Sequence, residues 1–144
     1  MIRLLGYIWA LPNTLVGLLV MLAYVPTSIR WSRGCLEVVP LWIAGDPGAQ
    51  TWGWLVLYCH ANARDDAALR VHERVHVTQA LKGGVFFSIA YAAQWLWFLP
   101  TSRRTADWMP WWYPAYMRVT YEATAYRVQD EYRHGLRPDA WGGR

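Results

Sequence analysis

Two histidines and one glutamate in this chain have the residue types and the spacing of a zinc site. His72 and His76 lie four residues apart, and Glu73 follows the first histidine, which gives the pattern His-Glu-x-x-His. Residues four apart share one face of an α-helix of about 3.6 residues per turn, so both imidazole rings can bind one ion. Glu73 then lies where its carboxylate can take a proton from a zinc-bound water. The pattern therefore predicts metal-assisted hydrolysis with Glu73 as the catalytic base.

A catalytic zinc ion commonly takes a third protein ligand, and Glu122 is the candidate that we expect to supply it. It is the only acidic residue between Asp107 and Asp130, in a segment (residues 115–134) that we expect to form the last helix. A buried carboxylate without a partner is costly, and zinc would be a suitable partner. The alternative is that Glu122 is exposed to solvent or paired with Arg118, four residues earlier.

These residues resemble a known family. The sequence HERVHVTQ, which begins at His72, and the later Tyr-Glu-Ala around Glu122 are similar to the small zincin metallopeptidases of the gluzincin type. The resemblance covers under about a fifth of the chain. It implies that His72, His76 and Glu122 bind Zn²⁺, that Glu73 is the general base, and that the substrate is a peptide or protein. A looser resemblance connects the chain to small bacterial membrane-associated proteins that pair an apolar amino-terminal segment with this motif.

Two further residues are candidates for supporting the ligands or contacting substrate. Gln79 lies seven residues after His72, almost on the same helix face, where it can orient a ligand. An ordinary polar residue at a helix edge is the alternative interpretation. Tyr126 stands where thermolysin-like enzymes have an acidic residue that supports a histidine ligand. Another residue must then give that support, and Asp130 is a candidate.

The composition favours contact with a membrane. The chain is 55% hydrophobic and only 17% charged, whereas soluble domains are about 25% charged. Its aromatic residues are mainly Trp and Tyr (11 and 9, against 3 Phe), which favour membrane–water interfaces. Residues 4–25 contain no charge and are long enough for a helix to span a bilayer. Because Pro12 interrupts this run, a kinked span and a shorter half-inserted helix are both open.

The net charge does not indicate a nucleic-acid partner. It is +4, with a pI of about 9.3, but the basic residues are scattered arginines and a single lysine, Lys82. Arginines that flank apolar segments near anionic lipid explain this charge more economically. We therefore expect a peptide or protein substrate, a lipid membrane and no nucleic acid as partners. The expected location is in or tightly bound to a membrane, which in bacteria would be the inner membrane.

The remaining pattern predicts an α+β fold that is mostly α. Residues 36–43 and 52–59 have the composition of strands and suggest a small antiparallel sheet. Pro40 favours an edge position for the first of them. By analogy with zincins, the second could pair with an extended peptide substrate. We expect two parts, an apolar membrane-associated segment (residues 1–30) and a zincin-like metal-binding domain (residues 31–144).

Three helices should follow the sheet. The helix with the histidines is predicted at residues 62–82, capped by Asn62 with Asp65 reaching back, and ended by two glycines. A second apolar helix is predicted at residues 85–99; because it is short for a span and Gln94 interrupts it, a buried or half-inserted helix is favoured over a full crossing. The third, at residues 115–134, would bring the second metal-ligand segment beside the first. The tryptophans and prolines between the last two helices, which include Trp108, could anchor the protein at lipid headgroups or merely cover the core.

Three functions are compatible with these patterns. The first is a membrane-associated zinc peptidase. The second is a non-catalytic membrane protein in which a structural zinc site joins two helices, and the third is an aromatic-rich interaction protein without metal. Metal content separates the third from the others. Loss of hydrolysis in Glu73→Gln with zinc retained separates the first from the second.

Overall fold

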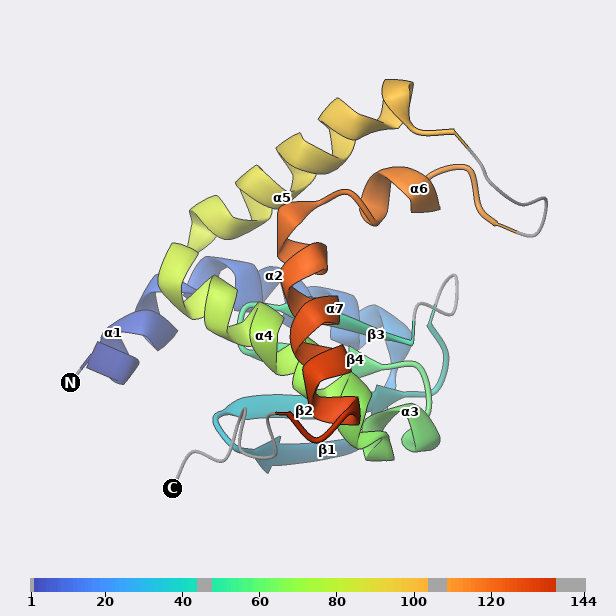
Figure 1. The fold of residues 1–144 in the computed structure, drawn as a ribbon. Coiled ribbons are helices and arrows are strands. Elements are labelled where there is room, and N and C mark those ends of the chain that lie inside the picture. The colour runs from blue at the N-terminus through green and yellow to red at the C-terminus, as the bar shows by residue number, and fades with distance from the viewer. Residues whose placement is uncertain (1, 44–47, 104–108, 137–144) are drawn as a thin grey trace.

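Helices pack on both faces of a small sheet in the computed structural model, which describes residues 2–43, 48–103 and 109–136 (Figure 1). The predicted α+β fold, mostly α, is confirmed. Trp108, which belongs to the predicted aromatic anchor, lies outside the described residues. The elements are α1 (Ile2–Trp9), α2 (Leu11–Tyr24), β1 (Pro26–Ser32), β2 (Cys35–Pro40), β3 (Ala49–Trp52), β4 (Leu55–Tyr58), α3 (Ala61–Asp65), α4 (Ala67–Gly83), α5 (Val85–Phe98), the 3₁₀ turn η1 (Leu99–Thr101), α6 (Tyr113–Tyr116) and α7 (Thr120–Arg133).

The uncharged amino-terminal run forms two helices rather than one. α1 ends at Trp9 and α2 begins at Leu11, with Pro12 in its first turn. Proline suits this position because its missing N–H would have no partner in the helix and its φ is already helical. The expected helix start near Pro12 is therefore correct. In the described parts of the chain, no helix has both the length and the apolar character that a bilayer crossing needs, so the predicted apolar spanning helix is not found.

α2 lies on one face of the sheet and is held there closely. Met21 packs with buried strand residues in a hydrophobic cluster. Gly17 allows the close approach, because a Cβ atom at this position would lie 2.3 Å from the Cβ of Trp52. The side-chain amide of Asn13 donates a hydrogen bond to the carbonyl of Gly84 at 2.7 Å. The amino-terminal segment is thus tied both to the sheet and to the end of α4.

The four-stranded sheet is mixed, which corrects the prediction of an antiparallel sheet. Its strand order is β1-β2-β4-β3, and β2 and β4 run parallel while the two outer pairs are antiparallel. The cause is that β3 forms a hairpin with β4 and takes the outside edge, so β4 returns beside β2. The predicted strand at residues 52–59 therefore covers the end of β3 and an interior strand. Pro40 does not mark an edge either, since it pairs with Pro26 of β1.

The helix with the two histidines begins later than predicted. Asp66 interrupts the segment, and its carboxylate accepts hydrogen bonds from the amides of Ala68 at 2.8 Å and Leu69 at 3.2 Å. Asp66 is therefore the cap of α4, and the predicted cap Asn62 lies inside the separate short helix α3. α4 ends at its glycines as predicted, with Gly84 at a positive φ of 55°. The predicted helix after it is α5.

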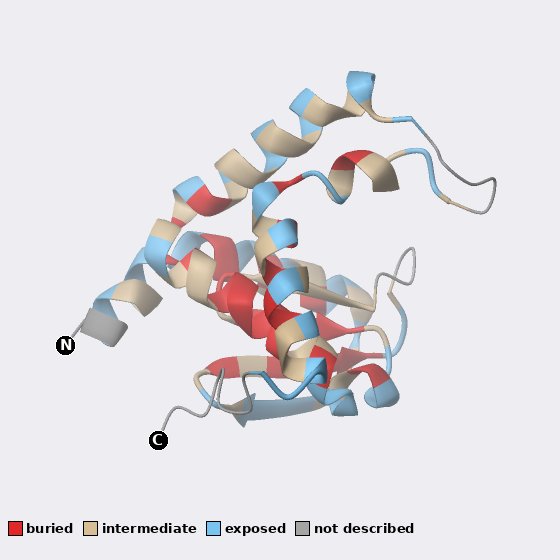
Figure 2. Ribbon diagram, in the orientation of Figure 1, coloured by how far each residue is buried: buried red, intermediate tan, exposed pale blue. Residues whose placement is uncertain are grey.

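α7 packs along α4, and this pairing brings the two predicted metal-ligand segments together (Figure 1). Val71 and Val75 of α4 form a hydrophobic cluster with Ala125 and Val128 of α7. Figure 2 shows that buried residues concentrate along α4 and in the strands behind it. The helix predicted at residues 115–134 is divided into α6 and α7, so α7 begins only two residues before Glu122.

Candidate metal centre

Three buried side chains converge between α4 and α7. His72 and His76 come from one face of α4, and Glu122 comes from the first turn of α7. The two Nε2 atoms are 3.1 Å apart, and each lies 3.2 Å from an oxygen of the Glu122 carboxylate. Ligand atoms held about 2.0–2.1 Å from a tetrahedral zinc ion are roughly 3.3 Å from one another. The three side chains can therefore hold a metal ion at nearly the spacing they already have.

The other nitrogen of each imidazole is held by a glutamine. Nδ1 of His72 lies 3.0 Å from the amide oxygen of Gln129, and Nδ1 of His76 lies 2.9 Å from that of Gln79. An amide oxygen only accepts, so each Nδ1 carries the hydrogen and each Nε2 presents its lone pair to the shared centre. Two lone pairs and a carboxylate at such short distances repel one another unless a cation lies among them. The hydrogen bonding thus fits a metal ion.

The charge state of the site points in the same direction. Burial would raise the pKa of Glu122, but the imidazoles of His72 and His76 beside it and the hydrogen bond from Tyr116 hold that pKa well below its usual range. Burial lowers the pKa of His76, while the hydrogen bond to Glu122 and its charge raise it, and the net shift is upward. The carboxylate therefore stays ionised and attracts a positive charge.

Two tyrosines clamp the carboxylate of Glu122 from outside the metal-ligand helices. The hydroxyl of Tyr91 in α5 donates to one oxygen at 2.7 Å, and that of Tyr116 in α6 donates to the other at 2.6 Å. Burial and the neighbouring carboxylate raise the pKa of both phenols, so they remain protonated donors. The sequence patterns did not single out either tyrosine in this role. No local spacing marks them, since they reach the site only through the packing of α5 and α6.

Glu73 lies beside the three ligands but is not one of them. It is buried and lines the same cavity as His76 and Glu122. The hydroxyl of Thr51, on the outer strand β3, donates to its carboxylate at 2.7 Å. This hydrogen bond fixes one oxygen of Glu73 on the cavity wall. The sequence did not reveal Thr51, because β4, α3 and the start of α4 lie between it and Glu73 in the chain.

The two residues predicted to support the ligands lie at the site. Gln79 holds His76 and also donates from its amide nitrogen to the carbonyl of Tyr121 at 3.2 Å. The ring of Tyr126 packs edge-on against His72, with ring centroids 4.5 Å apart. Mainly through burial, its pKa rises to about 12. Asp130 does not support His72, since the neighbouring Gln129 makes that contact.

A cavity of about 810 Å³ opens next to the three ligands. Its wall includes the outer strand β3, and among the residues that the structure describes its lining contains Glu73 and Glu122 but no lysine or arginine. Most of the remaining wall is aromatic or apolar, which excludes water from a bound molecule except near the carboxylates. The aromatic lining comprises Trp52, Phe87, Tyr91, Trp112, Tyr113, Tyr116 and Tyr126.

Comparisons with protein-family models, with curated proteins and with solved structures find no match to this chain. The function is therefore inferred from the site itself. In the described parts of the chain, the cluster of His, Cys, Asp and Glu side chains that can hold a metal has three members. A three-membered ligand set beside an open cavity leaves room for a further, exchangeable ligand.

Proposed function

We propose that this protein is a zinc-dependent, membrane-associated metallopeptidase that hydrolyses peptide bonds. The observation that carries the proposal is the position of Glu73, on the cavity wall next to a ligand set of only three residues. Structural zinc sites are usually closed by four protein ligands, whereas catalytic sites keep one position for water or substrate. The resemblance of the motif to gluzincins is in accord with this reading.

Each side chain has a definite task in such a reaction. Bound zinc would supply Lewis-acid chemistry, which polarises a carbonyl and lowers the pKa of water. His72, His76 and Glu122 would hold the ion. Glu73, held by Thr51, would accept a proton from the attacking water and pass it to the leaving amine.

The outer strand β3 offers a way to bind an extended substrate. Among the described residues it pairs with β4 on one side only, and its residues Ala49–Trp52 line the cavity. An extended peptide could add to this edge with its main chain and bring a peptide bond to the ligands. This role belongs to β3, because most of the strand predicted at residues 52–59 is interior.

The second candidate function is a structural zinc site. It is favoured by the fact that the candidate ligands join α4 to α7, as do the hydrogen bonds of His72 with Gln129 and of Gln79 with Tyr121. In that case zinc would contribute to folding stability, and Glu73 would be dispensable for every property except packing. An interaction protein without metal would bind no zinc at this site.

Association with a membrane is part of the proposal. Large apolar side chains on α1, α2 and α5 are exposed, and α2 and α5 carry no charged residue. Helices of this kind can lie in the interface with their apolar side against the acyl chains. We place the protein at the inner membrane of a bacterium on the resemblance noted above. The exposed side chains include Leu5, Ile8, Leu19, Leu22, Phe86 and Trp97.

The decisive experiment uses zinc-loaded protein and the Glu73→Gln variant. Glutamine keeps the shape of the side chain but cannot accept the proton, so hydrolysis of an unstructured protein substrate should fall by a factor on the order of 10² or more. Zinc content, measured by elemental analysis, should remain at one ion per chain. Unchanged turnover would contradict the assigned base, and a loss of zinc would make Glu73 a ligand. Absence of hydrolysis by the wild-type protein with zinc retained would support the structural site.

A further inference from the structure

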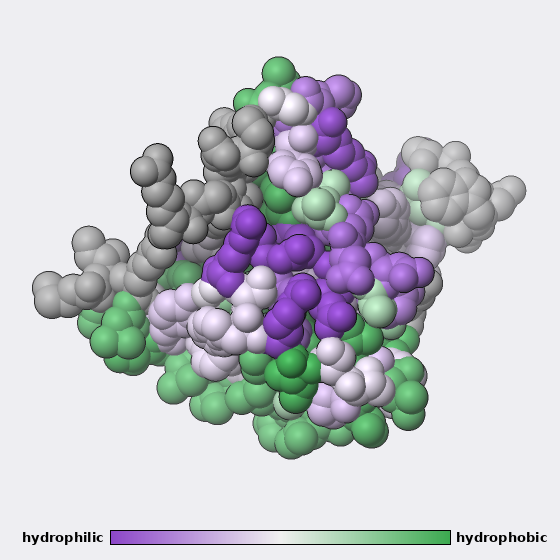
Figure 3. All heavy atoms as spheres, turned by 90° about the horizontal axis from the view of Figure 1, so that it is seen from below, coloured by the Kyte–Doolittle hydropathy of each residue, from purple (hydrophilic) through white to green (hydrophobic). Residues whose placement is uncertain are grey.

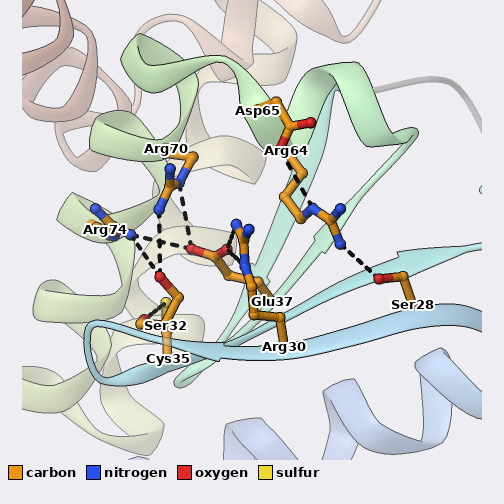
Figure 4. Close-up of polar contacts among 9 residues, drawn as sticks. All are labelled: Ser28, Arg30, Ser32, Cys35, Glu37, Arg64, Asp65, Arg70 and Arg74. Carbon is orange, nitrogen blue, oxygen red and sulfur yellow. Dashed lines mark hydrogen bonds and ion pairs between the residues drawn. The ribbon is translucent and has the colours of Figure 1, made fainter.

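A third buried carboxylate, besides Glu73 and Glu122, has arginines rather than histidines or tyrosines as its partners. Glu37 of β2 is fully buried and is surrounded by three arginines (Figure 4). Nε of Arg30 donates to it at 3.1 Å, and a terminal nitrogen of Arg74 donates at 3.2 Å. Nε of Arg70 lies 3.6 Å from the same carboxylate. One negative charge thus faces three positive charges from β1 and α4.

The positive charge exceeds the negative charge in the whole group. Arg64 adds a fourth guanidinium, and its only ionic contact in the group is with the exposed Asp65 at 3.8 Å. The group in Figure 4 therefore has four positive and two negative side chains, an excess of two. Holding like charges together at a partly buried place is costly without a counter-ion.

The guanidinium groups of the cluster also have more hydrogen-bond donors than the surrounding residues have acceptors. Terminal nitrogens of Arg70 and Arg74 both reach the hydroxyl of Ser32, at the long distances of 3.4 and 3.3 Å. Their Nε atoms are buried and have no hydrogen-bond partner. The side chain of Arg74 is only 7% exposed, so water does little to satisfy it. An acceptor with several oxygens would satisfy the terminal nitrogens that now share the single hydroxyl of Ser32.

The cluster is open to a ligand from one side. The side chains of Arg30 and Arg70 are 42% and 25% exposed. Alternation along β1 places Ser28, Arg30 and Ser32 toward α3 and α4 and leaves Ile29 and Trp31 on the opposite face. Figure 3, a view from below, shows hydrophilic residues gathered at the centre beside a hydrophobic border. None of these side chains lines the cavity at the metal ligands.

We propose that Arg30, Arg70 and Arg74 form a binding site for a phosphate group. A phosphate monoester carries a charge of about −1.5 to −2 at neutral pH, which matches the excess of two. Guanidinium groups present paired donors that fit phosphate oxygens, and the hydroxyl of Ser32 can turn to donate as well. The phosphate comes either from a small soluble molecule or from a lipid headgroup, since apolar surface borders the cluster.

The first test is a calorimetric titration of the purified protein with inorganic phosphate at low ionic strength. We expect saturable binding to one site that weakens with added salt. The double variant Arg30→Gln/Arg70→Gln should bind about tenfold more weakly or worse. The matched control is Arg118→Gln/Arg127→Gln, which removes two exposed arginines outside the cluster, one between α6 and α7 and one in α7. Its phosphate affinity should equal that of the wild type.

The variant Glu37→Gln tests the same site without removing a donor. It takes away the competing negative charge, so phosphate should bind several-fold more tightly, provided that circular dichroism shows the native fold. This variant carries the test if the double variant does not fold. Equal phosphate affinity in the wild type, the double variant and Glu37→Gln, or no binding at all in any of them, would overturn the proposal and leave a structural ion-pair network.

A second arm separates the two sources of phosphate. Vesicles of phosphatidylcholine are compared with vesicles that also contain phosphatidic acid, whose headgroup is a phosphate monoester. Stronger binding to the second kind that is lost in Arg30→Gln/Arg70→Gln identifies a lipid headgroup. Binding of inorganic phosphate without any such preference identifies a soluble ligand. Both outcomes are independent of peptide hydrolysis.

Discussion

Four side chains hold the carboxylate of Glu122, which makes it the most constrained group of the candidate metal centre. Each oxygen lies against one histidine and accepts a hydrogen bond from one tyrosine. A carboxylate fixed in this way loses little freedom when it binds a metal ion. The tyrosines hold both oxygens in place beside the histidines, which favours Glu122 as a metal ligand.

Glu122→Ala should therefore lower zinc affinity by more than about 100-fold, because it removes a ligand together with its charge. A competition titration against a zinc-binding dye measures this. Asp130→Ala is the matched control, since Asp130 lies on the same helix, is exposed and does not face the ligands. If Asp130→Ala weakened zinc binding more than Glu122→Ala, the third ligand would be misassigned.

The contribution of the tyrosine clamp can be measured separately. Tyr116→Phe keeps the ring and removes the hydroxyl that donates to Glu122. By analogy with other groups that orient metal ligands, zinc affinity should fall by about 10–100-fold. Tyr132→Phe alters a tyrosine of the α4–α7 hydrophobic cluster and should leave the affinity unchanged. Equal affinities in the two variants would mean that the clamp does not position the ligand.

Individual residues differ in how far the sequence could predict them. His72, Glu73 and His76 belong to one helix, so their spacing alone places them together. Glu122 was predicted because an isolated acid in an otherwise apolar stretch needs a partner. Its tyrosine clamp, Gln129 and Thr51 could not be predicted in the same way. They come from separate elements, and only the tertiary packing brings them to the site.

Helices and strands also differ in how far local sequence patterns predict them. The helices were predictable from apolar runs and from glycine and proline signals, as the ends of α4 and α5 confirm. The mixed sheet was not, because the parallel pairing of β2 with β4 depends on β3 taking the outer edge. The start of α4 was placed wrongly at Asn62, because the sequence pattern did not separate the short helix α3 from α4. Asp66 rather than Asn62 caps α4, because its carboxylate accepts hydrogen bonds from two amides of the first turn.

The cap of α4 gives a prediction at this scale. Asp66→Ala removes both hydrogen bonds and should lower the free energy of unfolding by about 0.5–2 kcal/mol, measured by urea denaturation. Asp65→Ala, at an exposed neighbouring position, should change it much less. Zinc stoichiometry should be the same in both, because His72 lies more than one helical turn beyond the cap. A loss of zinc in Asp66→Ala would mean that the start of α4 also positions the ligands.

For the molecule as a whole, the proposed peptidase site and the exposed apolar helices must be considered together. α2 covers one face of the sheet and α1 packs on α4, and both expose leucines on their outer side, while the cavity opens between β3, α5 and α6. The ring of Phe86 at the start of α5 packs against that of Trp9 of α1, so the exposed apolar side continues from α1 onto α5. If the apolar side lies in the headgroup region, a protein segment close to the bilayer would then be the substrate nearest to the cavity.

Membrane association is tested by substituting side chains that the fold does not need. Leu19 and Leu22 of α2 are 69% and 64% exposed, so Leu19→Glu/Leu22→Glu should leave the unfolding free energy nearly unchanged. Binding to phosphatidylcholine vesicles should fall by about tenfold or more, because two leucine side chains no longer enter the apolar phase and two charges must be kept out of it. Leu136→Glu changes an equally exposed leucine beyond the end of α7 and serves as the control. Flotation of vesicles with bound protein measures the binding of the wild type and both variants.

Should the wild-type chain remain soluble and monomeric without detergent and bind vesicles no better than the double variant, the apolar side of α2 would not be a membrane surface. The metal centre would be unaffected by that result, because none of its ligands lies on α1 or α2.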